Sequence, residues 1–182
     1  MKIENLVLFI FLFFLVGFFV FSNLKPNEYK LELNSEKNIT KENYTKYEID
    51  TNGFIKAKIN VDYILGNSAE ISLVAGCYLI KATTDSFVAE AIIKGKEKKI
   101  EFRPTVYDVI VDVFKSLGIE VLGLKIIDIR NNTYIGQLIL QQEDKVLFLD
   151  IRPSDGSAIA IRFDAPIYIN ESLAKKMGEY IC

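Results

Sequence analysis

The chain has 182 residues, half of them hydrophobic, and a formal net charge of −2. This length supports one domain with a sizeable core, and the acidic balance argues against holding nucleic acid by bulk electrostatics. The sequence has no histidine and only two cysteines, which excludes Ser-His-Asp and Cys-His nucleophiles, His-containing zinc sites and all-thiolate zinc sites.

The first segment is strongly apolar. An unbroken apolar run extends from Leu6 to Phe21, and with its neighbours the stretch 5–24 reaches the length that spans a bilayer. We therefore expect residues 1–24 to form a transmembrane helix that anchors the protein in the cell membrane by a single pass; a cleaved signal peptide is the alternative. The short tail before the span favours an external domain, although the flanking lysines do not decide the orientation.

Residues 25–50 are polar and show no sustained apolar period, which predicts a stalk. Glycosylation sequons permit modification of an external domain; they occur at Asn38, Asn43, Asn131 and Asn170. Cys77 lies in an apolar run, where a free thiol usually behaves as a small buried side chain. Cys182 is the last residue of the sequence, and a disulfide between the two cysteines stays an open alternative.

A single domain is expected from residue 54 to residue 182, starting where apolar and polar residues begin to alternate. Strands are predicted at 54–64, 70–75, 77–82, 100–103, 119–129, 133–141, 145–151 and 166–169. Helices are predicted at 85–94, capped by Thr84 and stopped by Gly95, and at 105–117, 153–162 and 172–177. The fold class is α+β, with a mixed, largely antiparallel sheet packed with three to four helices; turns at Asn131-Asn132 and Glu143-Asp144 make 119–151 a meander.

Three features of these elements predict burial. The apolar run 146–149 is typical of a strand covered on both faces. Gly156 and Ala160, four residues apart, give helix 153–162 a small face that allows close approach to the sheet. The helix 105–117 carries an apolar stripe, with Asp108 and Asp112 on its other side; the stripe consists of Val106, Val109, Ile110, Val113, Phe114 and Leu117.

Two strand-to-helix junctions repeat one pattern, an Arg-Pro step followed by a carboxylate. They are Arg103-Pro104 leading to Asp108, and Arg152-Pro153 leading to Asp155. The residue before a proline is extended, proline suits the first helical turn, and the helix dipole favours an acid there. Capping and local ion pairing explain both junctions without any chemistry. The alternatives are a metal or phosphate site shared by the two junctions, and an oligomer contact.

The junctions and the motifs between and after them resemble the bifunctional nuclease domain family, especially its archaeal members. The shared motifs are Arg103 to Asp108 with Asp112, Leu117-Gly118, Asn131 to Tyr134, Asp150 to Asp155, and Ala165 to Ile169. The resemblance covers roughly Ala69 to Cys182 and implies an α+β domain that self-associates, with nuclease activity as in the plant members. The family's first motif usually ends Thr-His-Asp; this chain has Val106 and Tyr107 before the acid, and Ser157 replaces a residue that is more often apolar.

Three functional hypotheses follow. The first is a membrane-tethered hydrolase of nucleic-acid phosphodiester bonds that uses carboxylate-held Mg²⁺ or Mn²⁺. Its expected residues are Asp108, Asp155, Arg103 and Arg152 for catalysis, Tyr107, Lys98, Lys99 and Ser154 for substrate binding, and Asp108, Asp112 and Asp155 as metal ligands, with Asp150 a further candidate. The second is a non-catalytic, homo-oligomeric binding domain, and the third a module that grips a small anion with two arginines.

Each of these assignments has a plainer alternative. The charged run 94–103 could contact phosphates, but such runs beside a helix end are usually solvated loops. Tyr107 could stack on a base or pack against a neighbouring subunit. The first and third hypotheses require Arg103 and Arg152 to converge on a common cavity.

Overall fold

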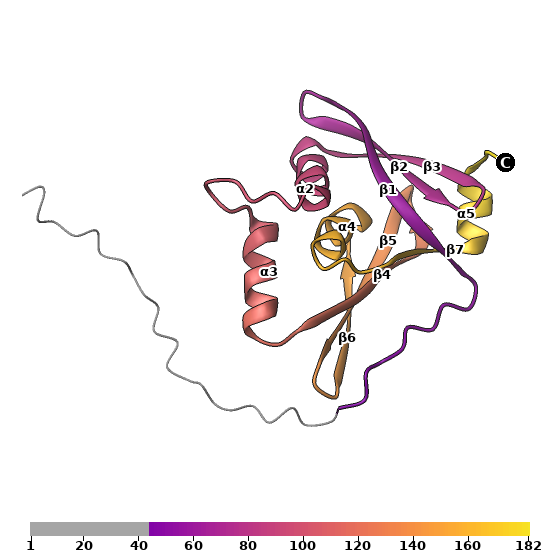
Figure 1. The fold of residues 1–182 in the computed structure, drawn as a ribbon. Coiled ribbons are helices and arrows are strands. Elements are labelled where there is room, and N and C mark those ends of the chain that lie inside the picture. The colour runs from indigo at the N-terminus through magenta and orange to yellow at the C-terminus, as the bar shows by residue number, and fades with distance from the viewer. Residues whose placement is uncertain (1–43) are drawn as a thin grey trace, which may run out of the picture. The chain divides into compact units, whose positions relative to one another are not determined.

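The computed structural model describes residues 44–182 (Figure 1). In chain order the elements are β1 (Phe54–Leu65), β2 (Ser68–Ala75), β3 (Tyr78–Asp85), α2 (Ser86–Lys96), α3 (Val106–Ser116), β4 (Glu120–Arg130), β5 (Thr133–Gln142), β6 (Lys145–Ile151), α4 (Pro153–Arg162), β7 (Ile167–Asn170), α5 (Glu171–Met177) and β8 (Glu179–Tyr180). The expected α+β class is confirmed, and the start and end of α4 agree with the prediction.

The strands form one sheet in the order β6-β5-β4-β7-β1-β2-β3-β8. Every pairing is antiparallel except that of β4 with β7. The sheet therefore consists of two meanders, β1–β3 and β4–β6, which the short strand β7 joins. Alternation along β1 buries Ala57 and Ile59 and exposes Lys56 and Lys58, as expected for a sheet with a covered face.

Three helices pack over the two meanders. α2 contacts β1–β3, α4 contacts β4 and β5, and the two helices contact each other, while α3 packs against α4 (Figure 1). The expected close approach of α4 is confirmed at Gly156, where a Cβ atom would lie 2.7 Å from Leu124 Cδ1. Leu124 is fully buried, so this contact fixes the start of α4 over the middle of the sheet.

The segment before β1 lies against β4 and β5. The Tyr47 N–H donates to Gln141 Oε1, and Gln141 Nε2 donates to the carbonyl oxygen of Thr45. These bonds satisfy a glutamine side chain that is 2% exposed. A Cβ atom on Gly123 would lie 2.8 Å from Ile49 Cδ1. The last residues of the expected stalk, Tyr44 to Asp50, thus belong to the compact unit.

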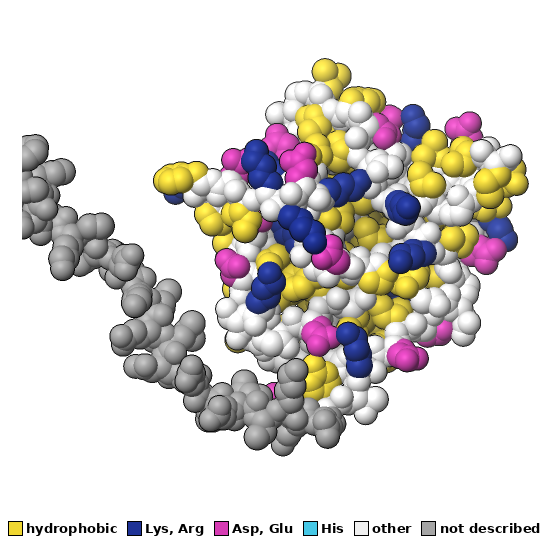
Figure 2. Space-filling model, viewed as in Figure 1, with side chains coloured by type: hydrophobic (Ala, Val, Ile, Leu, Met, Phe, Trp, Pro, Cys, Tyr) yellow, Lys and Arg dark blue, Asp and Glu magenta, His cyan; other side chains and the backbone are white. Residues whose placement is uncertain are grey.

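The structure corrects several of the predicted elements. Residues 100–103 are an irregular loop rather than a strand, and Phe102 is fully exposed there; Figure 2 shows a hydrophobic side chain at the tip of this loop. β6 is an edge strand, so Leu147, Phe148 and Leu149 are 42–48% exposed instead of covered on both faces. The meander it belongs to is confirmed, with Glu143 at a positive φ of 53° in its turn.

The third correction concerns the face of α3. Most of the expected core stripe points away from the protein, with Val106, Val109, Val113 and Leu117 45–56% exposed. Asp108, expected on the outer side, is instead 7% exposed. Apolar spacing identified the helix correctly but assigned the wrong face to the core, because an arginine of α4 draws Asp108 inward.

The ends of α2 also differ from the prediction. Its N-cap is Asp85 rather than Thr84, and the helix runs through Gly95 to Lys96. Glycine is needed there for space, because a Cβ atom would lie 2.9 Å from Arg162 Nη1.

A disulfide joins Cys77 to Cys182, with the Cα atoms 5.3 Å apart. Cys77 lies in the β2–β3 turn, and β8, which the sequence did not predict, pairs with β3 beside it. The cross-link therefore holds the C-terminal strand at the edge of the sheet, and Cys77 is not the buried free thiol that its surroundings suggested.

No helix within residues 44–182 is long and apolar enough to cross a bilayer. The expected span, residues 5–24, lies outside the described part of the chain.

Candidate active-site cleft

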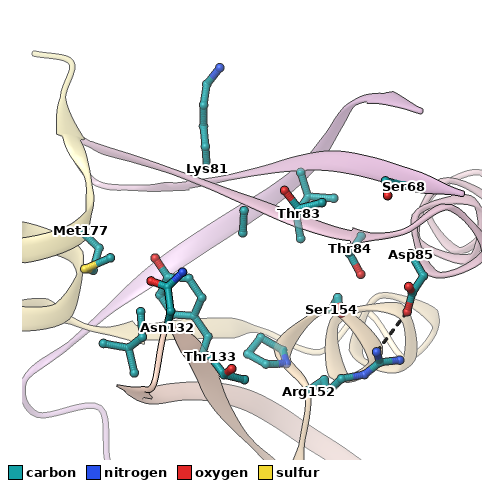
Figure 3. Close-up of a pocket in the computed structure, with 15 residues that line it drawn as sticks. Ser68, Lys81, Thr83, Thr84, Asp85, Asn132, Thr133, Arg152, Ser154 and Met177 are labelled. Atoms are coloured by element: carbon teal, nitrogen blue, oxygen red, sulfur yellow. Dashed lines mark hydrogen bonds and ion pairs between the residues drawn. The ribbon is translucent and has the colours of Figure 1, made fainter. Parts of the chain in front are cut away.

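A cleft of about 600 Å³ opens between β3, the β4–β5 turn and the start of α4 (Figure 3). Most of its polar lining consists of hydroxyl and amide groups. These groups belong to Ser68, Thr83, Thr84, Asn132, Thr133 and Ser154, and the charged side chains that line the cleft are Lys81, Asp85 and Arg152. Hydroxyls and an arginine can donate hydrogen bonds to phosphate oxygens.

Arg152 is positioned by the chain around it. It is the N-cap of α4 in an extended conformation, followed by proline at the first helical position, as the sequence predicted. Its Nε donates to Asp155 Oδ2 at 2.5 Å and its Nη1 to Asp85 Oδ2 at 3.1 Å, and these bonds raise the pKa of the guanidinium. The Arg152 side chain is 61% exposed, so it is both fixed and available at the cleft.

Asp155 connects this corner to α3. The Tyr107 hydroxyl donates to Asp155 Oδ1 at 2.5 Å. Burial of Tyr107, and then its hydrogen bond to Asp155, raise the pKa of the phenol far above its usual value. Tyr107 therefore stays a neutral donor at any physiological pH. It cannot replace the family's histidine as a base, but it fixes one oxygen of Asp155 while Arg152 fixes the other.

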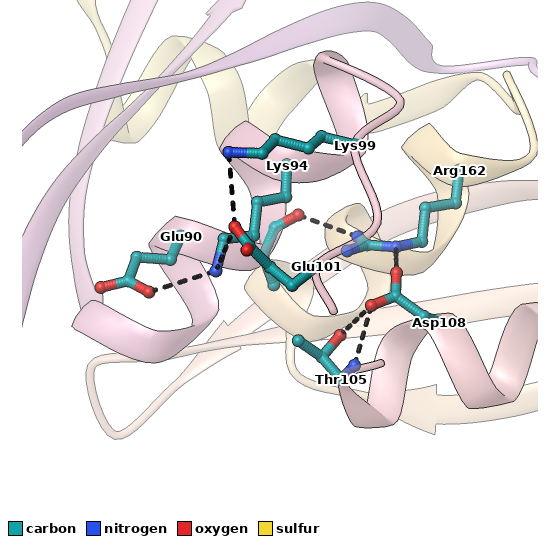
Figure 4. A network of polar contacts seen from close by, with 8 residues as sticks. Glu90, Lys94, Lys99, Glu101, Thr105, Asp108 and Arg162 are labelled. Atoms are coloured by element: carbon teal, nitrogen blue, oxygen red, sulfur yellow. Dashed lines mark hydrogen bonds and ion pairs between the residues drawn. The ribbon is translucent and has the colours of Figure 1, made fainter. Parts of the chain in front are cut away.

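At the second junction, both carboxylate oxygens of Asp108 are bound by groups of the protein itself. Asp108 Oδ1 accepts from Arg162 Nε at 2.9 Å, and Oδ2 accepts from the backbone and hydroxyl of Thr105 (Figure 4). Both charged side chains are 7% exposed. Burial alone would raise the pKa of Asp108, but the hydrogen bonds from Thr105 and Arg162 outweigh it and hold the pKa below its usual range.

The expected partner of Asp108 was Arg103, which has no ion pair within residues 44–182 and lies in the exposed loop before α3. The two junctions do meet, but through Tyr107: its hydroxyl binds Asp155, and the Arg162 guanidinium carbon lies 5.5 Å from its ring centre. The chain of contacts runs from Asp85 and Arg152 through Asp155 to Tyr107, and Arg103 is not part of it.

The three expected metal ligands are not brought together. Asp108 and Asp155 use both carboxylate oxygens in the contacts described above, while Asp112 is exposed. Asp150 is also exposed, on the edge strand β6. No group of three or more acidic or cysteine side chains within residues 44–182 is arranged to hold a metal ion. The three-carboxylate site therefore does not fit this arrangement, and only Asp85 and Asp155 lie beside Arg152.

Lys98 and Lys99 do not line the cleft. They line a separate pocket at the C-terminal end of α2, where Lys98 pairs with Asp164 at 3.0 Å and Lys99 with Glu101 at 3.5 Å. Of the other expected substrate-binding residues, Ser154 lines the cleft. Tyr107 does not line it but binds Asp155, the partner of Arg152.

Two residues of this network were absent from the sequence prediction. Asp85 stands just before a helix, a position where an N-cap acid is expected, so a signal was present. Arg162 stands in the last turn of α4, where a basic residue is favoured by the helix dipole alone. Nothing local distinguishes it as the partner of Asp108.

These features define an α+β domain with an arginine- and hydroxyl-lined cleft at an Arg-Pro-Ser-Asp junction. The model of the bifunctional nuclease domain matches residues 79–181, which include the cleft's Arg152 side and both junctions. Because this match covers more than half of the chain, the protein belongs to the bifunctional nuclease domain family.

Individual relatives match a shorter region. An uncharacterized protein of Mycobacterium tuberculosis is 36% identical over 76 residues, 42% of this chain and 44% of the relative. Bifunctional nuclease 1 of Oryza sativa subsp. japonica is 32% identical over 79 residues, and bifunctional nuclease 2 of Arabidopsis thaliana 36% over 80, each covering 42% of this chain and 24% of the relative. The matched regions span less than half of each relative, and these bacterial and plant proteins do not support the expected archaeal type.

Proposed function

We propose that this protein hydrolyses phosphodiester bonds of nucleic acids, with the sugar-phosphate backbone bound in the cleft at the start of α4. The observation that carries the proposal is the position of Arg152, exposed at a hydroxyl-lined cleft and held there by Asp85 and Asp155. An arginine fixed in this way can bind two phosphate oxygens and stabilise the charge that develops during hydrolysis. Membership of a nuclease-named family supports the same conclusion.

Asp155 is the acid that we assign to proton transfer. It lies next to Arg152, and Tyr107 and Arg152 fix both of its oxygens. A carboxylate held this way could accept a proton from an attacking water molecule, provided that substrate binding draws Arg152 onto the phosphate. Asp108, with its oxygens bound to Thr105 and Arg162, becomes a positioning residue that holds α3, and therefore Tyr107, in place.

We also propose a divalent ion at the cleft, held by two carboxylates instead of the three that the sequence suggested. Mg²⁺ is commonly held by only one or two protein carboxylates together with substrate phosphates and water. Asp85 and Asp155 are the two acids beside the cleft, and both contact Arg152. Mg²⁺ or Mn²⁺ bound there would neutralise phosphate charge and lower the pKa of a bound water.

The test uses the purified full chain, incubated with single-stranded and duplex nucleic acid, with and without Mg²⁺ or Mn²⁺. Asp155→Asn should lower cleavage by about a hundredfold or more, as loss of a general base does, and Arg152→Lys should do the same through loss of bidentate binding. Asp144→Asn, in the β5–β6 turn, is the matched control. Absence of cleavage, or cleavage unchanged by both cleft variants, would remove the hydrolase assignment.

The main alternative is a domain that binds nucleic acid or a small anion without cleaving it. It is favoured by the ion pairs that occupy Asp155 and Asp85, since both acids already neutralise an arginine. In that case the wild-type chain would bind single strands and leave them intact, and Arg152→Lys would abolish the binding. Arg103→Lys, in the exposed loop, should leave either activity unchanged if the cleft is the site.

We also propose that residues 5–24 anchor the protein in a cell membrane, with the domain on the external side. The cross-link between Cys77 and Cys182 supports an external domain, because disulfides persist in oxidising compartments. Alkaline extraction of membranes should leave the chain in the pellet, and protease added to intact cells should degrade residues 44–182. Release by alkali, or protection from the protease, would count against the respective part of this proposal.

Self-association is the remaining proposal. The exposed apolar side chains Val106, Val109 and Val113 on α3 support it, because a monomer rarely leaves such a stripe in water. Light scattering of the wild-type chain should give a mass above that of one chain, and Val109→Asp should reduce it. A monomeric mass for the wild type would end this proposal.

A further inference from the structure

The cleft beside Arg152 has an apolar part as well as a polar one. The polar part, at the start of α4, carries Arg152 and Ser154. The apolar side chains outside α4 that line the same cleft are Ile71, Ala82, Ile129, Tyr134 and Met177. Figure 3 shows Met177 on the opposite side of the cleft from Arg152. The function proposed above uses only the polar part.

Strand pairing places four of these apolar side chains together. Ile129 is the partner of Tyr134 in the pairing of β4 with β5, and Ile71 is the partner of Ala82 in the pairing of β2 with β3. Residues directly opposite each other lie on the same face of a sheet, so each meander turns one apolar pair toward the cleft. This surface, called here the apolar floor, is therefore built by both halves of the sheet.

A small cavity of about 40 Å³ lies next to the apolar floor. Three of the floor residues line it, Ile71, Ala82 and Tyr134, and most of its other lining consists of core side chains such as Ile126 and Ile169. Cavities with apolar walls do not hold water well. The floor therefore has space behind it into which its side chains can shift when a flat group rests on them.

Tyr134 gives the floor an aromatic ring. The side chain is partly buried and packs against the core, and this burial raises the pKa of its phenol. Tyr134 is therefore neutral at physiological pH and does not repel a polyanionic strand. Met177, at the end of α5, adds a thioether, a group that makes favourable contacts with aromatic rings. A ligand that suits the whole cleft carries an anion next to a flat ring, as a nucleotide does.

We infer that Tyr134 stacks on an unpaired base of the strand whose phosphate Arg152 binds. The inference rests on the proposed function, because it requires the sugar-phosphate backbone to lie in this cleft. Aromatic stacking accepts every base, and the amide of Asn132 can both donate to and accept from a base edge. Figure 3 shows Asn132 on the Met177 side of the cleft. A duplex would have to release a base first, which costs unpairing and unstacking energy, so the cleft takes single strands.

The experiment measures binding of a short fluorescent single strand to the full chain by anisotropy, without divalent ions so that no cleavage occurs. A second strand has the same phosphates but lacks its bases. The strand with bases should bind about tenfold more tightly, the effect of one base stacked on an aromatic ring. Tyr134→Leu should remove this difference, and Tyr134→Phe, which keeps the ring, should retain it. Tyr63→Leu, at an exposed tyrosine of β1, is the matched control and should change neither affinity.

The outcomes separate this inference from the proposed function. Equal binding of the two strands, both weakened by Arg152→Lys, would overturn the inference and leave the cleft as a phosphate site. Equal losses in Tyr134→Leu and Tyr63→Leu would overturn it as well. Failure of both strands to bind would reject the proposed function and the inference with it.

The comparison of the two strands on the wild-type chain needs no variant, so the inference stays testable if Tyr134→Leu does not fold. In that case Met177→Gln changes the same part of the cleft at a side chain that is 37% exposed. It should reduce the preference for the strand with bases. An unchanged preference would place the base contact outside the apolar part of the cleft and overturn the assignment.

Discussion

The two Arg-Pro junctions begin alike in sequence and end in opposite environments. At the α4 junction the ion pair of Arg152 with Asp155 is open to solvent on the arginine side, which is 61% exposed. At the α3 junction Asp108 turns inward and pairs with Arg162, both 7% exposed. Exposed pairs contribute little to stability, whereas breaking a buried pair leaves a charge without compensation. The α4 junction is therefore suited to binding a ligand, and the α3 junction to stabilising the fold.

The largest expected effect comes from breaking the buried pair. Asp108→Ala should lower the free energy of unfolding by about 3–5 kcal/mol, because Arg162 would be left buried without its carboxylate. Urea denaturation measures this. Asp112→Ala, one turn along the same helix and exposed, should change stability by no more than about 0.5 kcal/mol. Similar losses in both variants would contradict the assignment of different roles.

The same pair predicts a dependence on pH. In the folded state the hydrogen bonds from Thr105 and Arg162 hold the pKa of Asp108 below the usual aspartate value of 3.8. Its contribution to stability is therefore fully present above the unfolded pKa and is lost as the pH falls through the lower folded pKa. Denaturation midpoints measured below about pH 4 should fall more steeply for the wild type than for Asp108→Asn, which does not titrate. Parallel curves would show that the pair is not coupled to folding.

The link between the junctions has an intermediate effect. Tyr107→Phe removes the hydrogen bond to Asp155 but keeps the buried ring, and should cost about 1–2 kcal/mol in unfolding free energy. Under the proposed function it should also slow cleavage, because Asp155 would lose one of its two fixing contacts. Tyr63→Phe, which removes an exposed hydroxyl contact to Glu70, is the control. An unchanged stability of Tyr107→Phe would mean that the two junctions are independent.

The smallest effect on stability is expected at the cleft itself. Arg152→Ala should change the free energy of unfolding by no more than about 1 kcal/mol, because solvent screens an arginine that is 61% exposed. Thermal denaturation of the variant measures this. Under the proposed function the same variant should lose cleavage, so that stability and activity separate at one residue. A loss of stability as large as that of Asp108→Ala would make Arg152 a structural residue.

Local chemistry explains which parts of the fold were predictable. The start of α4 was predicted correctly because proline favours the first helical position, which Pro153 occupies. Gly156 indicated the close approach of α4 to the sheet. β6 was misjudged because a short apolar run does not say where its strand lies in the sheet, and that depends on pairing with β5. The α3 face was misjudged for a similar reason, since the inward turn of Asp108 depends on a residue 54 positions away.

In the candidate site, too, local contacts were predictable from the sequence and distant contacts were not. The pair Arg152 and Asp155 is three residues apart, and the junction pattern was enough to place it. The contact from Tyr107 to Asp155 spans 48 positions, and the pair of Asp85 with Arg152 spans 67. No local pattern encodes these separations, so the sequence could nominate the two junctions but not the residue through which they meet.

The central position of β7 has a consequence for the order in which this protein can fold. β4 and β1 are joined in the sheet only through residues 167–170, which the ribosome adds after both meanders. Each meander can pair within itself during synthesis, but the two are not joined into one sheet until this late strand is inserted between them. Because domains with such distant pairings fold slowly and expose unpaired edges meanwhile, a nascent chain stalled before residue 167 should be prone to aggregation.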